Sequence, residues 1–312
     1  MQRGVYKPIK IVGKGHSVCG ALPDIPRSVT MSENLLEIQN ICAGVEGRQL
    51  LHNISLNIAA GETHVLMGPN GAGKSTLGNV LMASPEYRLT EGKIIFDGKD
   101  ITEDGTDKRA KAGMFLSFQD PLEVPGISLE SFIRTSVQQV TGERVKLMAF
   151  RKELESAMDI LSMDHSYAAR DLNVGFSGGE KKKSEILQLL MLKPKFAILD
   201  ETDSGLDVDA VRTVSRGVEE FRKKNNGALL IITHSTRILE SLHVDRTHVI
   251  VKGRIVKEGD GSLVDEINKN GFDPFIPDEI KEEERKAALL AAAKAAMESV
   301  KTAELGGKRD VR

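Results

Sequence analysis

The segment GPNGAGKST, residues 68–76, has the residue types and spacing that bind the phosphates of a nucleotide. It fits the pattern G-x-x-x-x-G-K-[ST] and lies between an apolar run and a segment with helical spacing. Glycines let successive backbone N–H groups converge on phosphate oxygens, and the lysine reaches the β and γ phosphates. We therefore predict that a nucleoside triphosphate is bound by Gly68, Pro69, Asn70, Gly71, Ala72, Gly73, Lys74, Ser75 and Thr76.

A second candidate group of catalytic residues is the segment FAILDE, residues 196–201, an apolar run that ends in two acids. Ligands of open α/β sheets bind at the carboxyl ends of the strands. Asp200 is therefore placed to hold Mg²⁺ together with the Ser75 hydroxyl. Glu201 is placed to orient or deprotonate an attacking water, so we predict that it is the general base.

Apolar, β-branched runs that alternate with helical segments must position these groups. Such a pattern is typical of a parallel sheet covered on both faces. The expected strands are residues 63–68, 93–98, 196–200, 228–233 and 249–256, and the expected helices lie at 75–83 and within 128–193. No internal repeat is visible, which indicates one nucleotide-binding unit.

The bulk composition excludes several classes of protein. The formal net charge is −2, which gives no reason to expect a nucleic-acid partner. The chain has two cysteines, Cys19 and Cys42, too few for a disulfide framework or a four-cysteine metal site. No stretch of about 20 apolar residues occurs, so we expect no direct membrane insertion.

The two ends differ in composition from the middle. Residues 1–30 are basic and poor in acids, and we interpret residues 1–33 as a disordered extension. The alternative is a transit peptide, which would send the chain to a plastid or mitochondrion rather than leave it in the cytoplasm. Residues 266–312 are interpreted as a C-terminal extension, an exposed helix rich in Glu, Lys and Ala.

Further motifs follow the phosphate loop in an order that resembles the ATP-binding cassette (ABC) family. They are Gln119 in LSFQDP, Ser177-Gly178-Gly179 before Glu180, Asp207 in SGLD and His234 in IITHS. The resemblance covers about residues 35–265 and implies an α/β fold. It implies an ABC ATPase domain at 34–265, with a RecA-like parallel sheet core, an antiparallel β subdomain and a helical subdomain at about 127–190.

The same resemblance implies roles for these residues in binding ATP and Mg²⁺. Two copies would sandwich two ATP molecules, with Ser177, Gly178 and Gly179 facing the γ-phosphate held by the other copy. A helix that begins at such a motif also offers an anion site. Gln119 would contact Mg²⁺ and the water, His234 the γ-phosphate, and Asp207 the dimer interface. Glu201, His234 and Gln119 are thus the expected catalytic residues, and Ser75, Asp200 and Gln119 the expected metal ligands.

Within the ABC family the sequence is similar to the SufC group, the ATPases of Suf iron–sulfur cluster assembly. The similar segments are NVGFSGGEKKKSEILQ, LDETDSGLDVDA, FQDPLEVPGIS and THVIVKGRIVKEGD. This implies a scaffold of SufB- and SufD-like partners, docked at residues 119–128 and the helices that follow. The alternatives are the ATPase subunit of a membrane transporter and a non-catalytic adaptor that uses ATP as a clamp; Glu201 argues against the adaptor.

Three consecutive lysines follow the Ser-Gly-Gly motif. Helical spacing predicts that Lys181 faces solvent, and that Lys182 or Lys183 turns toward the body of the domain. Because an unpaired buried ammonium is costly, an acid partner is expected. Our hypothesis is that Lys182 pairs with Glu201 and holds this base away from the water. The alternative is a solvated lysine run with no special role.

The segment ICAGVEGRQLL, upstream of the phosphate loop, lacks the aromatic residue that stacks on adenine in many ABC proteins. Val45 is the best match to that position. We therefore predict weak discrimination between ATP and other purine nucleoside triphosphates.

Overall fold

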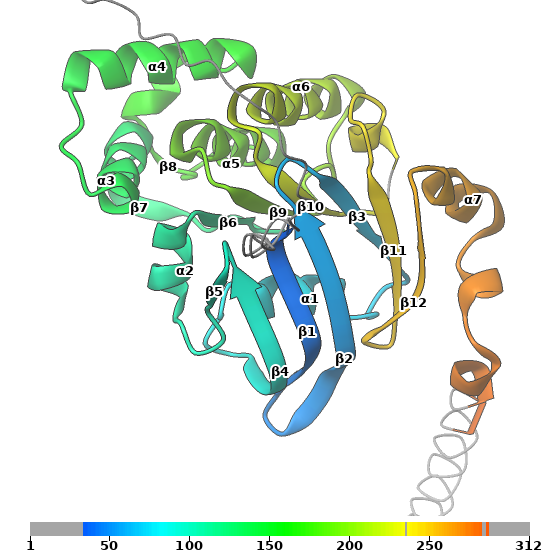
Figure 1. Cartoon of the computed structure of the whole chain (residues 1–312). Coiled ribbons are helices and arrows are strands. Elements are labelled where there is room, and N and C mark those ends of the chain that lie inside the picture. The colour runs from blue at the N-terminus through cyan, green and yellow to red at the C-terminus, as the bar shows by residue number, and fades with distance from the viewer. Residues whose placement is uncertain (1–33, 235, 283–284, 287–312) are drawn as a thin grey trace, which may run out of the picture. The chain divides into compact units, whose positions relative to one another are not determined.

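The computed structural model describes residues 34–234, 236–282 and 285–286 (Figure 1). The predicted extension at residues 1–33 lies outside this part of the chain. So does most of the predicted C-terminal helix, residues 287–312.

A six-stranded sheet forms the centre of the described region. Its strands lie in the order β12-β11-β3-β10-β9-β6. β11, β3, β10, β9 and β6 run parallel, and β12 pairs antiparallel with β11. This confirms the parallel α/β sheet predicted from the apolar runs. The predicted strand at residues 93–98 is the exception, because it falls in β4 (Arg88–Phe96), which pairs antiparallel with β1 in another sheet. The strands are β3 (Thr63–Met67), β6 (Met114–Ser117), β9 (Phe196–Asp200), β10 (Ala228–Ile232), β11 (Arg246–Val251) and β12 (Arg254–Gly259).

Two smaller sheets are antiparallel. The first has four strands in the order β2-β1-β4-β5, and the second is the pair β7–β8. The four-stranded sheet agrees with the antiparallel part of the fold implied by the family resemblance. The strands are β1 (Asn34–Val45), β2 (Arg48–Ala59), β4 (Arg88–Phe96), β5 (Lys99–Asp100), β7 (Val124–Ser128) and β8 (Asp171–Leu172).

Seven α-helices and three short 3₁₀ helices complete the described part of the chain. The α-helices are α1 (Lys74–Leu81), α2 (Thr106–Ala112), α3 (Leu129–Thr141), α4 (Leu147–Ile160), α5 (Gly178–Leu192), α6 (Val208–Asn225) and α7 (Ser262–Asn270). The 3₁₀ helices are η1 (His165–Ala169), η2 (Arg237–Leu239) and η3 (Asp273–Phe275). Helices α3, α4 and α5 fall within residues 128–193, where the sequence predicts mainly helix.

Alternate residues of the central strands enter two separate hydrophobic cores. On β3, Val65 and Met67 belong to one core and Leu66 to the other. The first core lies against α3, α4, α5 and α6, and the second contains α1 and the four-stranded sheet. Because both faces of the central sheet are buried, β3, β9 and β10 are buried at every position and are mostly apolar.

The apolar run at residues 249–256, predicted as one strand, instead forms two. It is divided between β11 and β12 by a turn at Lys252 and Gly253. Gly253 has a φ of 71°, and a Cβ there would lie 1.8 Å from the Leu50 carbonyl oxygen. Only glycine avoids both the left-handed strain and this collision, so the chain reverses at this point.

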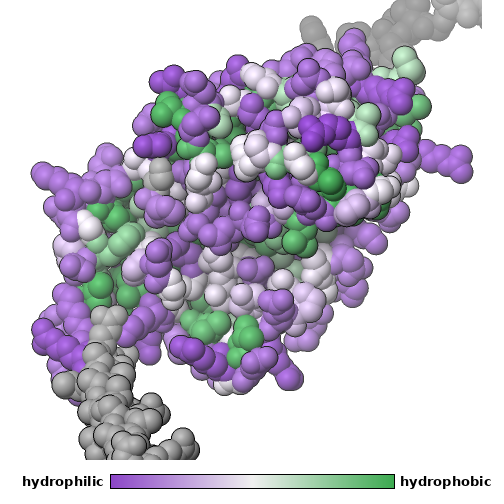
Figure 2. Space-filling view, turned by 180° about the vertical axis from the view of Figure 1, so that it is seen from behind, coloured by the Kyte–Doolittle hydropathy of each residue, from purple (hydrophilic) through white to green (hydrophobic). Residues whose placement is uncertain are grey.

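Apolar side chains on the face opposite to that of Figure 1 lie in separate small patches among hydrophilic residues (Figure 2). Single exposed apolar residues of this kind are normal for a folded domain.

Two buried histidines on neighbouring strands form a polar chain inside the sheet. The Nε2 atom of His248 lies 3.0 Å from Nδ1 of His64. His64 Nε2 lies 3.0 Å from a Glu62 carboxylate oxygen, and His248 Nδ1 lies 2.9 Å from one of Glu258. Burial lowers the pKa of both rings, that of His248 to about 4. Burial therefore favours neutral rings near pH 7.

We expect the free energy of unfolding to fall as the pH is lowered from about 7 to about 5. A histidine whose pKa is depressed on folding stabilises the fold above its unfolded pKa, 6.5. That stabilisation is lost as the pH falls toward the folded value, because the unfolded chain binds protons first. For His248 the loss by pH 5 is roughly 2 kcal/mol. Urea unfolding across this range measures it.

The variant His248→Gln is the control, because glutamine is polar but does not titrate, and its stability should vary less with pH. A stability of the parent chain that is constant or rises toward pH 5 would contradict the expectation. The chain Glu62–His64–His248–Glu258 has three contacts, and each needs one proton to form a hydrogen bond. Two neutral imidazoles supply only two. The contradicting result would therefore mean that a third proton is already bound near pH 7.

Candidate functional site

The phosphate loop follows β3 and ends where α1 begins at Lys74. A Cβ at Gly68 would lie 2.1 Å from the Ile250 carbonyl oxygen, so β11 leaves room there only for glycine. Gly73 has a φ of 103°, which also favours glycine. The buried Lys74 Nζ donates to the carbonyl oxygens of Gly68, at 2.8 Å, and Pro69, at 3.1 Å. The ammonium is thus held over the loop that the sequence assigns to phosphates.

Asp200 ends β9 and is 4% exposed. One of its carboxylate oxygens, Oδ1, has no hydrogen-bond partner among the residues that the structure describes. Burial raises the pKa of Asp200, against the opposing effect of the nearby Ser75 side chain and of Lys182 and Lys74. A buried carboxylate oxygen beside a hydroxyl fits a Mg²⁺ ion, which prefers oxygen ligands.

Glu201, Gln119 and His234 come together beside Asp200, although they are far apart in the sequence. The Gln119 side-chain amide donates to a Glu201 carboxylate oxygen at 2.6 Å. His234 Nδ1 lies 3.5 Å from the other carboxylate oxygen of Glu201. The structure therefore brings together the three residues that the sequence assigns to catalysis. Their catalytic roles stay a prediction.

The backbone of Glu201 adopts an unusual conformation, with a φ of 46°. Its N–H donates to the carbonyl oxygen of Ile232 on β10, at 2.9 Å. A left-handed conformation is costly for a residue with a side chain, and it persists where the surroundings enforce it. The contact with β10 thus fixes where the Glu201 carboxylate projects.

The Ser-Gly-Gly motif begins α5, and Asp207 begins α6. The Ser177 hydroxyl accepts a hydrogen bond from the Glu180 N–H, and Asp207 accepts one from the Ala210 N–H. Ser177 and Gly178 are exposed, so the start of α5 is open to a ligand. The expected role of Ser177, Gly178, Gly179 and Asp207 across a dimer stays a prediction.

Glu180 is a functional candidate that the sequence reasoning missed. Its carboxylate accepts from the Ser177 N–H at 2.7 Å and so completes a capping box. The Tyr167 hydroxyl donates to the other carboxylate oxygen of Glu180. Arg170 stacks over the rings of Tyr167 and Phe176, with its guanidinium carbon 4.4 and 4.7 Å from their centroids. The spacing Ser-x-x-Glu could have indicated the capping box, but not the tyrosine.

The predicted pairing of Lys182 with Glu201 is wrong. The Lys182 ammonium donates to the carbonyl oxygens of Phe118, at 2.7 Å, and Gln119, at 2.8 Å. Its nearest acid is Glu185, with 3.7 Å between Lys182 Nζ and a Glu185 carboxylate oxygen. The reason is helical geometry, because Glu185 lies three residues further along α5 and on the same buried face. Lys182 is buried, as one of the two inward lysines was expected to be.

Lys181, predicted to face solvent, is partly exposed and also has a partner that was not predicted. Its side chain is 20% exposed and forms an ion pair with Glu123, with 3.0 Å between Nζ and a carboxylate oxygen. Lys183 donates to the carbonyl oxygen of Ser162. The three lysines therefore reach three different segments, which helical periodicity alone could not show.

Glu185 is buried beside Lys182. Burial raises the pKa of its carboxyl to about 7, against the opposing effect of Lys182. One carboxylate oxygen accepts from the Phe118 N–H at 2.7 Å. No pattern in the sequence indicated this contact, because the two residues are 67 positions apart.

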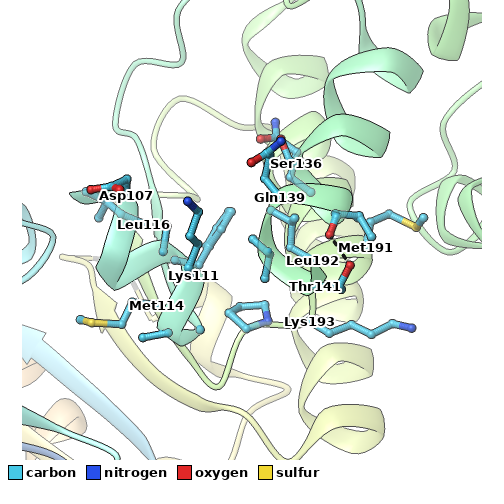
Figure 3. A pocket seen from close by; sticks show the side chains of 18 of the residues that line it. Asp107, Lys111, Met114, Leu116, Ser136, Gln139, Thr141, Met191, Leu192 and Lys193 are labelled. Carbon is cyan, nitrogen blue, oxygen red and sulfur yellow. Dashed lines mark hydrogen bonds between the residues drawn. The ribbon is translucent and has the colours of Figure 1, made fainter. Parts of the chain in front are cut away.

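A groove of about 970 Å³ lies next to these residues, lined mostly by apolar side chains of α2, β6, α3 and the end of α5 (Figure 3). In Figure 3, Asp107 and Lys111 of α2 stand on one side of the groove and Ser136 and Gln139 of α3 on the other. Phe118 also lines it and is 58% exposed. The groove is therefore adjacent to the loop that carries Gln119.

Comparison with known proteins places this site in a family. Residues 51–204 match the ABC transporter family. The chain is similar to vegetative protein 296 of Bacillus subtilis, with 44% identity over 245 residues, 78% of this chain and 94% of the relative. It is also similar to a probable ABC transporter ATP-binding protein of Streptococcus pyogenes, with 45% identity over 255 residues, 80% of this chain and 99% of the relative.

A solved structure shows the same fold. It is that of cbiO1 from Clostridium perfringens, described as part of the ABC transporter complex cbiONQ. The TM-score is 0.60 and the identity 26%, over 85% of this chain and 99% of that chain. The sequence motifs, the sheet order and these relatives agree, and the chain belongs to the ABC transporter family as one of its ATPases.

Proposed function

We propose that the chain is the ATP-hydrolysing subunit of an iron–sulfur cluster assembly scaffold built from SufB- and SufD-like proteins. In this proposal, ATP brings two copies of the chain together, and their closure remodels the scaffold. The observation that carries the proposal is the segment FQDPLEVPGIS, residues 118–128, whose sequence is SufC-like and whose apolar side chains are exposed. Phe118 is 58% exposed, Leu122 80% and Ile127 44%.

Different residues of the chain have different roles in ATP hydrolysis. The backbone of the phosphate loop and Lys74 hold the phosphates, and Glu201 orients and deprotonates the attacking water. Gln119 and His234 contact the Glu201 carboxylate from two sides. The Gln119 amide donates to one carboxylate oxygen, and His234 Nδ1 lies close to the other. Ser75, Asp200 and Gln119 would hold Mg²⁺, which would supply charge to offset that of the phosphates.

A second copy of the chain completes each site in this proposal. Ser177 and Gly178 are exposed at the beginning of α5, a helix of 15 residues. The first N–H groups of such a helix attract an anion, and here that anion is the γ-phosphate held by the other copy.

The groove beside the loop after Gln119 suits a partner segment with an apolar face. Phe118 and Ile127 line the groove, and the exposed Leu122 lies between them in the sequence of this loop. Charged groups at the rim, among them Asp107 and Lys111, would fix the orientation of the partner. A partner docked there presses on the same loop that carries Gln119.

The second candidate function is that of a motor subunit in a membrane transporter. The names of the relatives favour it, since one is a probable ABC transporter ATP-binding protein. In the part of the chain that the structure describes, no helix is both long and apolar enough to cross a membrane. The partner that occupies the groove therefore decides between the two functions.

We expect Glu201→Gln to lower the kcat of ATP hydrolysis by about 100-fold or more, because general base catalysis contributes about 10²–10⁴-fold. ATP binding should persist, since the phosphate loop is unchanged. Steady-state hydrolysis and equilibrium ATP binding measure the two effects, with Glu219→Gln on α6 as the matched control. Hydrolysis at the parent rate would instead favour the non-catalytic clamp.

We expect ATP and GTP to bind with dissociation constants within about threefold of each other. Val45, at the end of β1, offers no ring for the base, whereas stacking on an aromatic residue contributes about 1–3 kcal/mol per base. Competition binding measures the ratio. Val45→Tyr should tighten ATP binding by about tenfold, and a strong ATP preference of the parent chain would contradict the prediction.

We expect Leu122→Asp to reduce capture of the scaffold by at least tenfold, because it places a charge in an apolar contact. Met148→Asp is the matched control, since Met148 on α4 is 79% exposed but lies outside the loop after Gln119. Quantitative mass spectrometry of the native complex measures both variants and identifies the partner. Recovery of a membrane permease through the Leu122 surface would establish the transporter role instead.

A further inference from the structure

The backbone of Phe118 and Gln119 leaves the central sheet and needs other hydrogen-bond partners. The pairing of β6 with β9 ends at Ser117, opposite Leu199. β7 begins only at Val124, so the residues between these strands have no ladder of their own. Backbone groups near a protein interior are costly when unpaired, and they are therefore satisfied by side chains where strands do not reach.

Two side chains of α5 supply those partners. The Lys182 ammonium donates to the carbonyl oxygens of Phe118 and Gln119 at 2.7 and 2.8 Å. The Glu185 carboxylate accepts from the Phe118 N–H at 2.7 Å. The donor and the acceptor of one peptide segment are thus held by opposite charges on the same helix. We call Lys182 and Glu185 the backbone clamp.

The backbone clamp is buried, which makes it sensitive to the loss of either member. The side chains of Lys182 and Glu185 are 6% and 5% exposed, and 3.7 Å separate Nζ from a carboxylate oxygen. That carboxylate oxygen, Oε2, has no hydrogen bond within the described ranges. Removing one member leaves the other as an uncompensated buried charge, whereas replacing both by neutral groups does not.

The segment held by the backbone clamp leads directly to the catalytic groups. Gln119, whose backbone carbonyl is held by Lys182, donates its side-chain amide to Glu201 at 2.6 Å. Asp200, the expected metal ligand, is close enough to influence the charge of both Lys182 and Glu185. A shift of the clamped backbone therefore moves the amide that holds Glu201.

We propose that Lys182 and Glu185 are positioning residues for ATP hydrolysis, which set the place of Gln119 relative to Glu201 by holding the backbone of residues 118 and 119. Neither side chain touches the nucleotide in this proposal. They act through Gln119, and the inference rests on the proposed roles of Gln119 and Glu201.

The backbone clamp also connects two surfaces of the subunit. Lys182 lies five residues after Ser177 on α5, so one helix carries both the start of the anion site and the clamp. The clamped segment begins the loop with the exposed Phe118 and Leu122. A partner that displaces this loop therefore pulls on α5, and movement of α5 on dimerisation pulls on Gln119.

The test compares Lys182→Met with Lys183→Met in the full chain. Methionine keeps most of the volume of lysine and removes the donor. Lys183, the next residue of α5, donates to the Ser162 carbonyl and not to the loop at 118–119, so it is a matched control. Lys182→Arg restores a charged donor and should recover part of the activity.

Two measurements are needed for each variant. The first is steady-state ATP hydrolysis, in which Lys182→Met should lower kcat by at least tenfold and change the dissociation constant of ATP by less than twofold. The second is hydrogen exchange of the Phe118 amide, which should become faster in Lys182→Met and in Glu185→Ala. Lys183→Met should leave both unchanged.

Two results would overturn the proposal. One is a kcat of Lys182→Met that is equal to or above that of the parent, as expected if Lys182 restrained the base instead. The other is a lower kcat that follows the folded fraction of the protein while exchange of the Phe118 amide is unchanged, which indicates a merely structural role. If Lys182→Met does not fold, the double variant Lys182→Met/Glu185→Gln carries the same test, because it removes both buried charges.

These measurements use the chain without its scaffold, so they do not depend on which partner docks in the groove. The variant Glu201→Gln tests the catalytic base separately. If Glu201→Gln lowers kcat as expected but Lys182→Met has the kcat of the parent chain, the role of the backbone clamp is refuted and the proposed function is not.

Discussion

The parallel register of the central strands is the constraint on which the candidate site depends. Ile232 of β10 is opposite both Leu66 of β3 and Asp200 of β9, and Leu199 is opposite Ser117 of β6. Four strands therefore end at one edge of the sheet. The phosphate loop, the pair Asp200–Glu201, His234 and Gln119 each follow one of these ends. A shift of one residue in any pairing would move a catalytic group by about 3.3 Å and to the other face.

The charges at this edge are tolerated because almost every one has a partner. Asp200, Lys182 and Glu185 are each less than 6% exposed, and an isolated charge in that environment is costly. Lys182 faces two carbonyl oxygens and one carboxylate, and Glu185 faces a backbone N–H. One carboxylate oxygen of Asp200 and one of Glu185 have no hydrogen bond among the described residues. The Glu185 oxygen lies 3.7 Å from the Lys182 ammonium, which offsets its charge. The Asp200 oxygen lies at the end of β9, where it would attract a cation.

Most of the fold and the grouping of the candidate site residues could be predicted from the sequence, because both depend on local patterns. The runs at 63–68, 196–200 and 228–233 are mostly apolar, and they form β3, β9 and β10. The glycines of residues 68–76 and the acids after β9 were recognised from their spacing alone. The run at 249–256 was predicted as one strand, because the reversal at Gly253 depends on the approach of Leu50, which is distant in the sequence.

The sequence by itself determined which residues are predicted to bind phosphate, which acids follow β9 and which family the chain resembles. It could not assign the partners of the three lysines, because helical spacing gives the direction of a side chain but not what lies opposite. Only the tertiary structure decided that Lys182 holds the loop at Gln119 and that Lys181 reaches Glu123. The physical reason is that the irregular backbone after β6 must find hydrogen-bond partners. Those partners come from a helix more than 60 residues away.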